Sequence, residues 1–125
     1  MARILTISVE DISIRAELFD TETADALYEA APFSSEARSW GEEVYFRTPL
    51  LLAREADARD IVEVGELAFW TEGSAVAIGF GPTPASVDGE IRLGTPCNLW
   101  GRALGDVKAL VNVSEGAMVH VTRED

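Results

Sequence analysis

The chain has 125 residues, a hydrophobic fraction of 47% and a formal net charge of −12 at pH 7. This length and composition predict one globular domain over residues 1–125 and exclude a disordered chain. The acidic balance argues against nucleic acid and membranes as partners, because both bind through clustered Lys and Arg, and leaves a cationic partner as a minor alternative.

The apolar runs are too short for a signal-peptide core or a membrane span. Cys97 is the single cysteine. A lone cysteine cannot form an internal disulfide, which fits a reducing compartment. We therefore expect a cytoplasmic protein in which Cys97 is a structural thiol.

The chain opens with a predicted β-hairpin followed by a helix. Apolar residues alternate over residues 5–9 and 12–18, on either side of an acidic turn. The apolar period then changes to that of a helix over residues 21–31. Thr21 is a suitable N-cap, and Pro32 ends the helix.

From residue 33 onward the sequence is rich in predicted strands. Short apolar stretches bounded by Gly, Pro and Asp indicate strands at residues 33–40, 43–48, 60–65, 67–70, 75–80, 98–104 and 117–122. Residues 50–56 fit either a short helix or a loop, and residues 82–96 are expected to form a loop. Asp106 can cap a helical turn that runs through Leu110. Seven or eight short strands with one main helix predict a mainly β fold, a closed antiparallel barrel.

Four segments, at residues 40–46, 65–70, 73–84 and 98–106, resemble the small prokaryotic cyclophilin-like family. This family consists of minimal barrels related to a Thermotoga protein of unassigned function. The Phe-Gly-Pro-Thr-Pro run within the third segment is the most specific part. The resemblance covers about residues 3–123 and implies a cyclophilin-like barrel of about eight strands with a cleft on one side.

The resemblance also raises prolyl isomerisation as an alternative activity. True cyclophilins use an Arg, a nearby Gln and a hydrophobic proline pocket. This chain contains no Gln and lacks the Phe-His-Arg order that carries the catalytic Arg. Arg47 and Arg102 are similar only in character, so no catalytic residue is assigned.

The sequence shows none of the common patterns of catalytic or metal sites. The only histidine, His120, and Cys97 match no metal-ligand spacing, and we expect no metal and no cofactor. The alternation of the last strand predicts that His120 faces solvent. Two acidic pairs, Glu42 with Glu43 and Glu63 with Glu66, are interpreted as solvated surface carboxylates, because neighbours on a strand face opposite sides.

The candidate site is the stiff corner that follows the strand at residues 75–80. Its two prolines fix the backbone, so a ligand need not supply the entropy of ordering it. Outward-facing aromatic rings would line a cleft beside this corner, with Arg and Asn side chains as polar anchors. The candidate ligand-binding residues are Tyr45, Arg47, Trp70, Phe80, Gly81, Pro82, Thr83, Pro84, Asn98 and Arg102.

These features predict a binding module that holds a peptide segment or a small metabolite, such as an organic acid, without covalent chemistry. Alternatively, the prolines only end a strand and discourage edge pairing. A third alternative is an assembly protein, in which a barrel edge forms a homodimer.

Overall fold

In the computed structural model, which describes residues 3–124, the chain begins with a hairpin of β1 (Ile4–Val9) and β2 (Ile12–Leu18). Helix α1 (Glu22–Ala30) follows, and the Thr21 side chain caps it by accepting a hydrogen bond from the Ala24 backbone N–H at 3.1 Å. The predicted hairpin, helix and cap are therefore confirmed.

The rest of the chain is mainly β, as predicted. Residues 50–56 form neither helix nor strand, so the loop alternative holds there. No helix within residues 3–124 combines the length and the apolar character needed to cross a membrane. The remaining elements are β3 (Phe33–Glu36), β4 (Arg38–Ser39), β5 (Glu43–Arg47), β6 (Arg59–Val62), β7 (Glu66–Trp70), β8 (Ala75–Gly79), β9 (Ile91–Ala103), the 3-10 helix η1 (Val107–Asn112) and β10 (Met118–Arg123).

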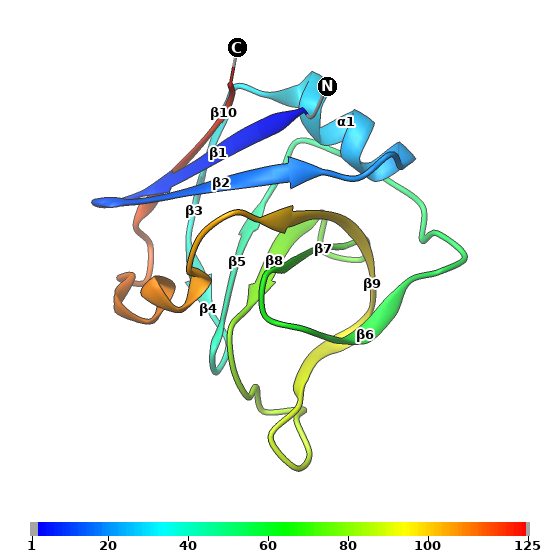
Figure 1. The fold of residues 1–125 in the computed structure, drawn as a ribbon, viewed down its shortest axis with the longest axis vertical. Coiled ribbons are helices and arrows are strands. Elements are labelled where there is room, and N and C mark those ends of the chain that lie inside the picture. Colours follow the sequence, from blue (N-terminus) through cyan, green and yellow to red (C-terminus); the bar gives the residue numbers. More distant parts are fainter. Residues whose placement is uncertain (1–2, 125) are drawn as a thin grey trace.

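The strands form an antiparallel sheet that closes into a barrel (Figure 1). Their order is β3-β10-β1-β2-β9-β7-β8-β5-β4, and β6 pairs with β9 outside this path. The end strands β3 and β4 belong to one segment, in which the buried Ala37 separates the two strands. This segment pairs with β10 through β3 and with β5 through β4. Counted as one strand, it gives the predicted barrel of eight strands.

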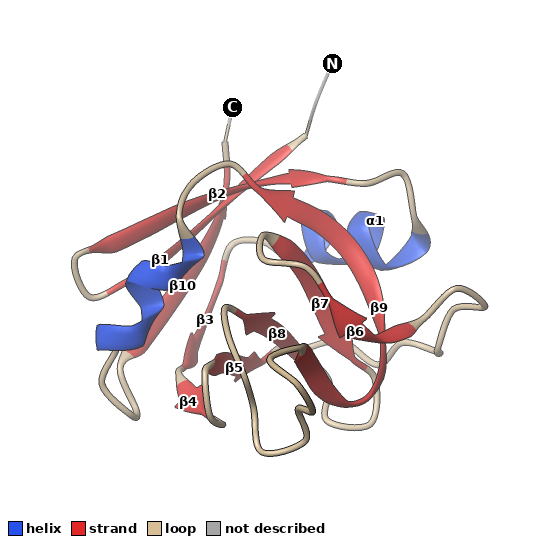
Figure 2. Ribbon diagram, turned by 60° about the horizontal axis from the view of Figure 1, so that its bottom comes forward, coloured by secondary structure: helices blue, strands red, loops and turns tan. Residues whose placement is uncertain are grey.

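The main core fills the barrel, because alternate residues of each strand point inward. Val44 and Phe46 of β5 are buried there, together with Trp100 of β9. The indole Nε1 of Trp100 donates to the backbone oxygen of Ala68 at 3.0 Å, so this large ring is both packed and hydrogen-bonded. Helix α1 lies beside β9 and adds Leu27, which is only 1% exposed (Figure 2).

Strand β9 begins earlier than its sequence predicts. Residues 91–96 were expected to belong to a loop because they include Gly94 and Pro96, but they continue the strand. The first half of β9 pairs with β6, and a register shift lies in this ladder, between the Arg59 and Ile61 pairs. A bulge of this kind accommodates residues that cannot continue a regular ladder. The result is a long, curved strand that extends past the barrel wall (Figure 1).

Candidate functional site

A hollow lies on the outer face of β5, β8 and β7, where the first half of β9 folds over them. The register places Tyr45, Ala77 and Ala68 in one row across the three strands, and Arg47, Ala75 and Trp70 in the next. Each row therefore has a large residue on β5 and an alanine on β8. The alternation that buries Val44 and Phe46 inside the barrel puts these rows outside.

Small residues on the outer face of β8 allow β9 to approach and leave space beneath it. A Cβ atom added at Gly79 would lie 2.6 Å from Cγ2 of Ile91, so a larger residue there would force Ile91 to shift. Ile91 and Leu93 form a second, smaller core cluster with Ala77 of β8 and Cys97. Between this cluster and the aromatic side chains of β5 and β7 the packing is incomplete.

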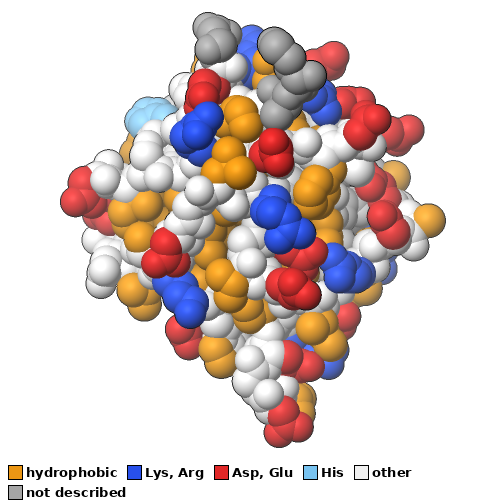
Figure 3. Space-filling model, viewed as in Figure 1, with side chains coloured by type: hydrophobic (Ala, Val, Ile, Leu, Met, Phe, Trp, Pro, Cys, Tyr) orange, Lys and Arg blue, Asp and Glu red, His pale blue; other side chains and the backbone are white. Residues whose placement is uncertain are grey.

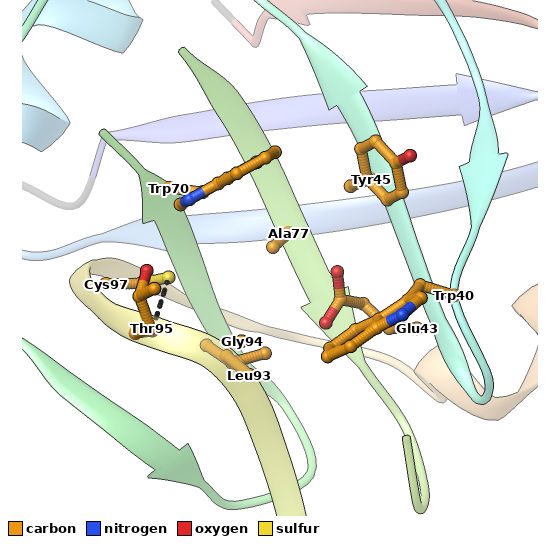
Figure 4. A pocket seen from close by; sticks show the side chains of 9 residues that line it. All are labelled: Trp40, Glu43, Tyr45, Trp70, Ala77, Leu93, Gly94, Thr95 and Cys97. Atoms are coloured by element: carbon orange, nitrogen blue, oxygen red, sulfur yellow. Dashed lines mark hydrogen bonds between the residues drawn. The ribbon is translucent and has the colours of Figure 1, made fainter. Parts of the chain in front are cut away.

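The resulting space, called the aromatic pocket here, has a volume of about 290 Å³. Figure 4 shows its aromatic rings and the Glu43 carboxyl around the small Ala77 side chain of β8. The pocket is lined by Trp40, Glu43, Tyr45, Trp70, Ala77, Leu93, Gly94, Thr95 and Cys97.

The three aromatic rings are held by specific contacts. Tyr45 and Trp70 pack edge to face, with ring centroids 6.3 Å apart and an interplanar angle of 89°. The Trp70 ring also lies directly over Gly73, where an added Cβ would come within 2.3 Å of it. Trp40 extends toward Gly94 of β9. A Cβ atom added at Gly94 would lie 3.6 Å from the Trp40 ring, an ordinary contact distance. Trp70 is the most exposed of the three, at 36%, and stands at the mouth of the pocket.

Glu43 is the only acidic side chain among the described lining residues, and it is buried rather than solvated. It is 6% exposed, and this burial raises the pKa of its carboxyl to about 7. Its Oε1 atom has no hydrogen-bond partner, and neither has the buried Thr95 Oγ1 on the opposite wall. The interpretation of Glu43 as a surface carboxylate was therefore wrong. It was also wrong for Glu66, which is 7% exposed and pairs with Arg59 at 2.6 Å.

Cys97 offers no nucleophile at neutral pH. Its side chain is buried, and its Sγ donates to the backbone oxygen of Thr95 at 3.3 Å. Burial, together with the nearby Glu43 charge, raises the pKa of the thiol to about 12, so it stays protonated. Within residues 3–124 no three His, Cys, Asp or Glu side chains gather as metal ligands do. His120 is exposed, as predicted, and shares a hydrogen bond of 2.9 Å with Ser34 (pale blue in Figure 3).

Comparisons with known proteins agree with this architecture. A family model described as Cyclophilin-like matches residues 3–122. The chain belongs to the cyclophilin-like family. The solution structure of a hypothetical protein from Archaeoglobus fulgidus is similar to this cyclophilin-like chain, with a TM-score of 0.86 and 35% sequence identity over 98% of this chain and 95% of that one. A search of curated proteins found no match.

The cyclophilin-like barrel brings together three of the residues predicted for the site. Tyr45, Arg47 and Trp70 line a second hollow of about 520 Å³, called the adjoining pocket here. Tyr45 and Trp70 also line the aromatic pocket, so the two spaces meet at this ring pair. The adjoining pocket further contains Arg38 and Glu36, which makes it more polar than its neighbour.

The structure does not bring the predicted proline corner, residues 80–84, to this ring pair. Phe80 is buried in the main core, and the backbone of Glu42 exchanges hydrogen bonds with Phe80 and Pro82 at 2.9 Å. The hydroxyl of Thr83 donates to the Arg92 backbone oxygen. Phe80, Gly81 and Pro82 line a separate hollow of about 430 Å³. Pro84 packs against Gly41, and its Cδ atom would lie 2.8 Å from a Cβ atom added to that glycine.

The last two predicted residues also lie outside the aromatic pocket. Asn98 is fully buried, and its amide holds the loop before β6 against α1. It donates to Thr23 Oγ1 and the Ala53 oxygen, both at 3.0 Å, and accepts from the Glu55 N–H at 2.7 Å. Arg102 is exposed on β9, opposite Glu17 of β2 in the ladder. A ligand role for these residues and for the proline corner stays a prediction.

Proposed function

We propose that this protein is a binding module that holds a small ligand or a single peptide side chain in the aromatic pocket. The observation that carries the proposal is the pair of buried, unpartnered oxygens, Glu43 Oε1 and Thr95 Oγ1, on opposite walls of an otherwise apolar space. Buried polar atoms normally have hydrogen-bond partners, and leaving them without one costs stability. A ligand that reaches both atoms would remove this cost.

The size and walls of the pocket support this function. Its volume of about 290 Å³ lies just below the range for drug-sized ligand sites, roughly 300–1,000 Å³. Such a space admits a small metabolite or one side chain, but not a folded segment. The rings of Trp40, Tyr45 and Trp70 provide apolar surface that is already ordered, so little conformational entropy is lost on binding.

The adjoining pocket supports a ligand that extends beyond the aromatic pocket. The two spaces share Tyr45 and Trp70, so a group buried against Glu43 could continue past the ring pair toward Arg47. A peptide would place one side chain in the aromatic pocket and its backbone along the adjoining pocket. A small metabolite would fill the aromatic pocket alone.

The site chemistry favours binding without covalent bonds. The Cys97 thiol is protonated, because its pKa is raised to about 12, and no described lining residue is a histidine or a serine. The isomerase alternative needs a cation beside the bound proline, and among the described lining residues of the aromatic pocket none is an Arg. Binding is therefore the better-supported function, while isomerisation and homodimer formation stay predictions.

A ligand panel tests the proposal through the fluorescence of the two pocket tryptophans. Metabolites and short peptides are titrated into the wild-type protein, the variant Trp70→Ala and the control Val111→Ala. Val111 is 61% exposed on η1, outside the aromatic pocket. We expect ligands that bind the wild type and the control but not Trp70→Ala. A panel without any such ligand, or ligands insensitive to Trp70, would contradict the proposed function.

A further inference from the structure

We propose that the group bound in the aromatic pocket is an organic ammonium cation, held between the carboxylate of Glu43 and the faces of the aromatic rings. This inference rests on the proposed function and names the chemical class of its ligand. A substituted small amine and the side chain of a lysine residue both carry this group.

The charges that line the pocket are complementary to a cation. Glu43 is buried, with only 6% of its surface exposed. Figure 4 shows its carboxyl pointing into the space beside the Trp40 ring. None of the described lining residues is Lys, Arg or His, so the carboxylate has no cationic partner there. A buried carboxylate is stabilised by an opposite charge that also donates a hydrogen bond. An anionic ligand would be repelled by this carboxylate, which argues against the organic acid expected from the sequence.

The aromatic walls of the pocket also favour a cation. A cation is attracted to the face of an aromatic ring, most strongly to Trp, and the attraction grows when the site is dry. Trp40, Tyr45 and Trp70 all line the same small space as the Glu43 carboxyl. A neutral alkyl group would gain the same apolar contacts but neither the ring attraction nor the ion pair. The combination therefore selects for positive charge rather than for apolar bulk alone.

The overall charge of the protein favours the approach of a cationic ligand. The chain has a net charge of −12, and Figure 3 shows acidic side chains spread over the molecular face in view. A field of this sign raises the local concentration of small cations and lowers that of anions. The basic residues Arg38 and Arg47 lie in the adjoining pocket, beyond the Tyr45 and Trp70 rings. They could meet a carbonyl or carboxylate elsewhere on the same ligand.

Protonation of Glu43 links this binding to pH. Besides Glu43, the lining residues include the titratable Tyr45 on the same strand and Cys97 on β9, while β7 and β8 contribute Trp70 and Ala77. The pKa of Glu43 is raised to about 7 and that of Cys97 to about 12, so Glu43 ionises first of these two. Because only the ionised carboxylate attracts a cation, affinity should be about tenfold higher at pH 8 than at pH 6.

The test compares ligands of the same shape and different charge. Choline is titrated against its neutral carbon isostere, 3,3-dimethylbutan-1-ol, and against N-acetyl-lysine methylamide, with tryptophan fluorescence as the readout and sodium chloride holding ionic strength constant. We expect choline or the lysine probe to bind at least about tenfold more tightly than the alcohol, as a cation held by rings and a carboxylate should. Preference between the two cations distinguishes a small amine from a peptide side chain.

Two variants complete the test. Glu43→Gln should weaken binding of the cation by about tenfold or more and remove its dependence on pH between 6 and 8. The control Glu42→Gln removes a carboxylate from the exposed neighbouring position. It should leave the affinity for the cation and its pH dependence unchanged. If the alcohol binds as tightly as choline and Trp70→Ala abolishes its binding, the cation inference is overturned while the binding function stands. Cation binding that Glu43→Gln leaves intact would also overturn the inference.

Discussion

The substitution Glu43→Gln should make the protein more stable at alkaline pH. In the folded protein burial raises the pKa of this carboxyl from 4.5 to about 7. Between these values the folded state holds a proton that the unfolded chain has lost. The free energy of unfolding of the wild type therefore falls as pH rises through this interval. Glutamine has a similar shape but does not ionise, so the variant should lack this fall.

The size of the effect follows from the two pKa values. A shift from 4.5 to about 7 corresponds to about 3 kcal/mol between the fully protonated and fully ionised limits. Between pH 5.5 and pH 9, about 2 kcal/mol of this difference should appear. Lower pH is less useful because the sequence pI is about 4.4, where solubility is poor.

Urea unfolding of both proteins at several pH values measures this difference directly. The control Glu42→Gln, at an exposed position, should follow the wild type across the range. A stability difference between Glu43→Gln and the wild type that stayed constant with pH would contradict the raised pKa of Glu43. A variant that lost stability relative to the wild type on going to alkaline pH would contradict it equally.

Three further predictions concern the packing around the barrel. Leu27→Asp would bury an unpaired charge at a side chain that is 1% exposed, and should cost about 4 kcal/mol or more, so a melting temperature within a degree or two of the parent would disprove the helix–barrel contact. The thiol of Cys97, with a pKa of about 12 and 2% exposure, should react with an aromatic disulfide reagent at least about a hundredfold more slowly in the native protein than in urea; equal rates would contradict its burial. Gly41→Ala should cost about 2 kcal/mol or more in urea unfolding, because Gly41 has φ +61° and an added Cβ would lie 2.8 Å from the Thr83 Cα; an unchanged midpoint would argue against this close contact.

Local patterns in the sequence were sufficient to predict most of the fold. The alternation in β1 and β2 and the cap at Thr21 depend on neighbouring residues, which the sequence shows directly. The start of β9 was missed because Gly94 and Pro96 are typical of loops. What keeps residues 91–97 extended is pairing with β6, which lies far earlier in the chain: Val62 is opposite Ile91 and Arg59 is opposite Cys97. Such long-range pairing is not visible in a local pattern.

The site was predicted only in part for the same reason. Alternation along the strands points Tyr45 and Trp70 outward and Phe46 and Phe69 inward. It also points Glu43 to the same outer face as Tyr45, but a residue on the outer face of a barrel is normally exposed. Glu43 is buried because β9 folds over that face. The signal that could have indicated this cover was the run of Ala and Gly on the outer face of β8, which leaves room for another strand.

The segment of β3 and β4 that closes the barrel determines where the native structure should open most easily. β4 pairs with β5 through only two residues, Arg38 opposite Tyr45 and Ser39 opposite Val44, and both β4 side chains are exposed. Local opening is easiest where backbone pairing is short and burial is small. The amide of Trp40, bonded to the Glu43 oxygen at 2.9 Å, should therefore exchange with solvent hydrogen sooner than amides in the middle of β7 or β8. Trp40 follows β4 and Tyr45 lies on β5, so a molecule bound between their rings would hold these two strands together. Its binding would then be detectable as slower hydrogen exchange of the amides between β4 and β5.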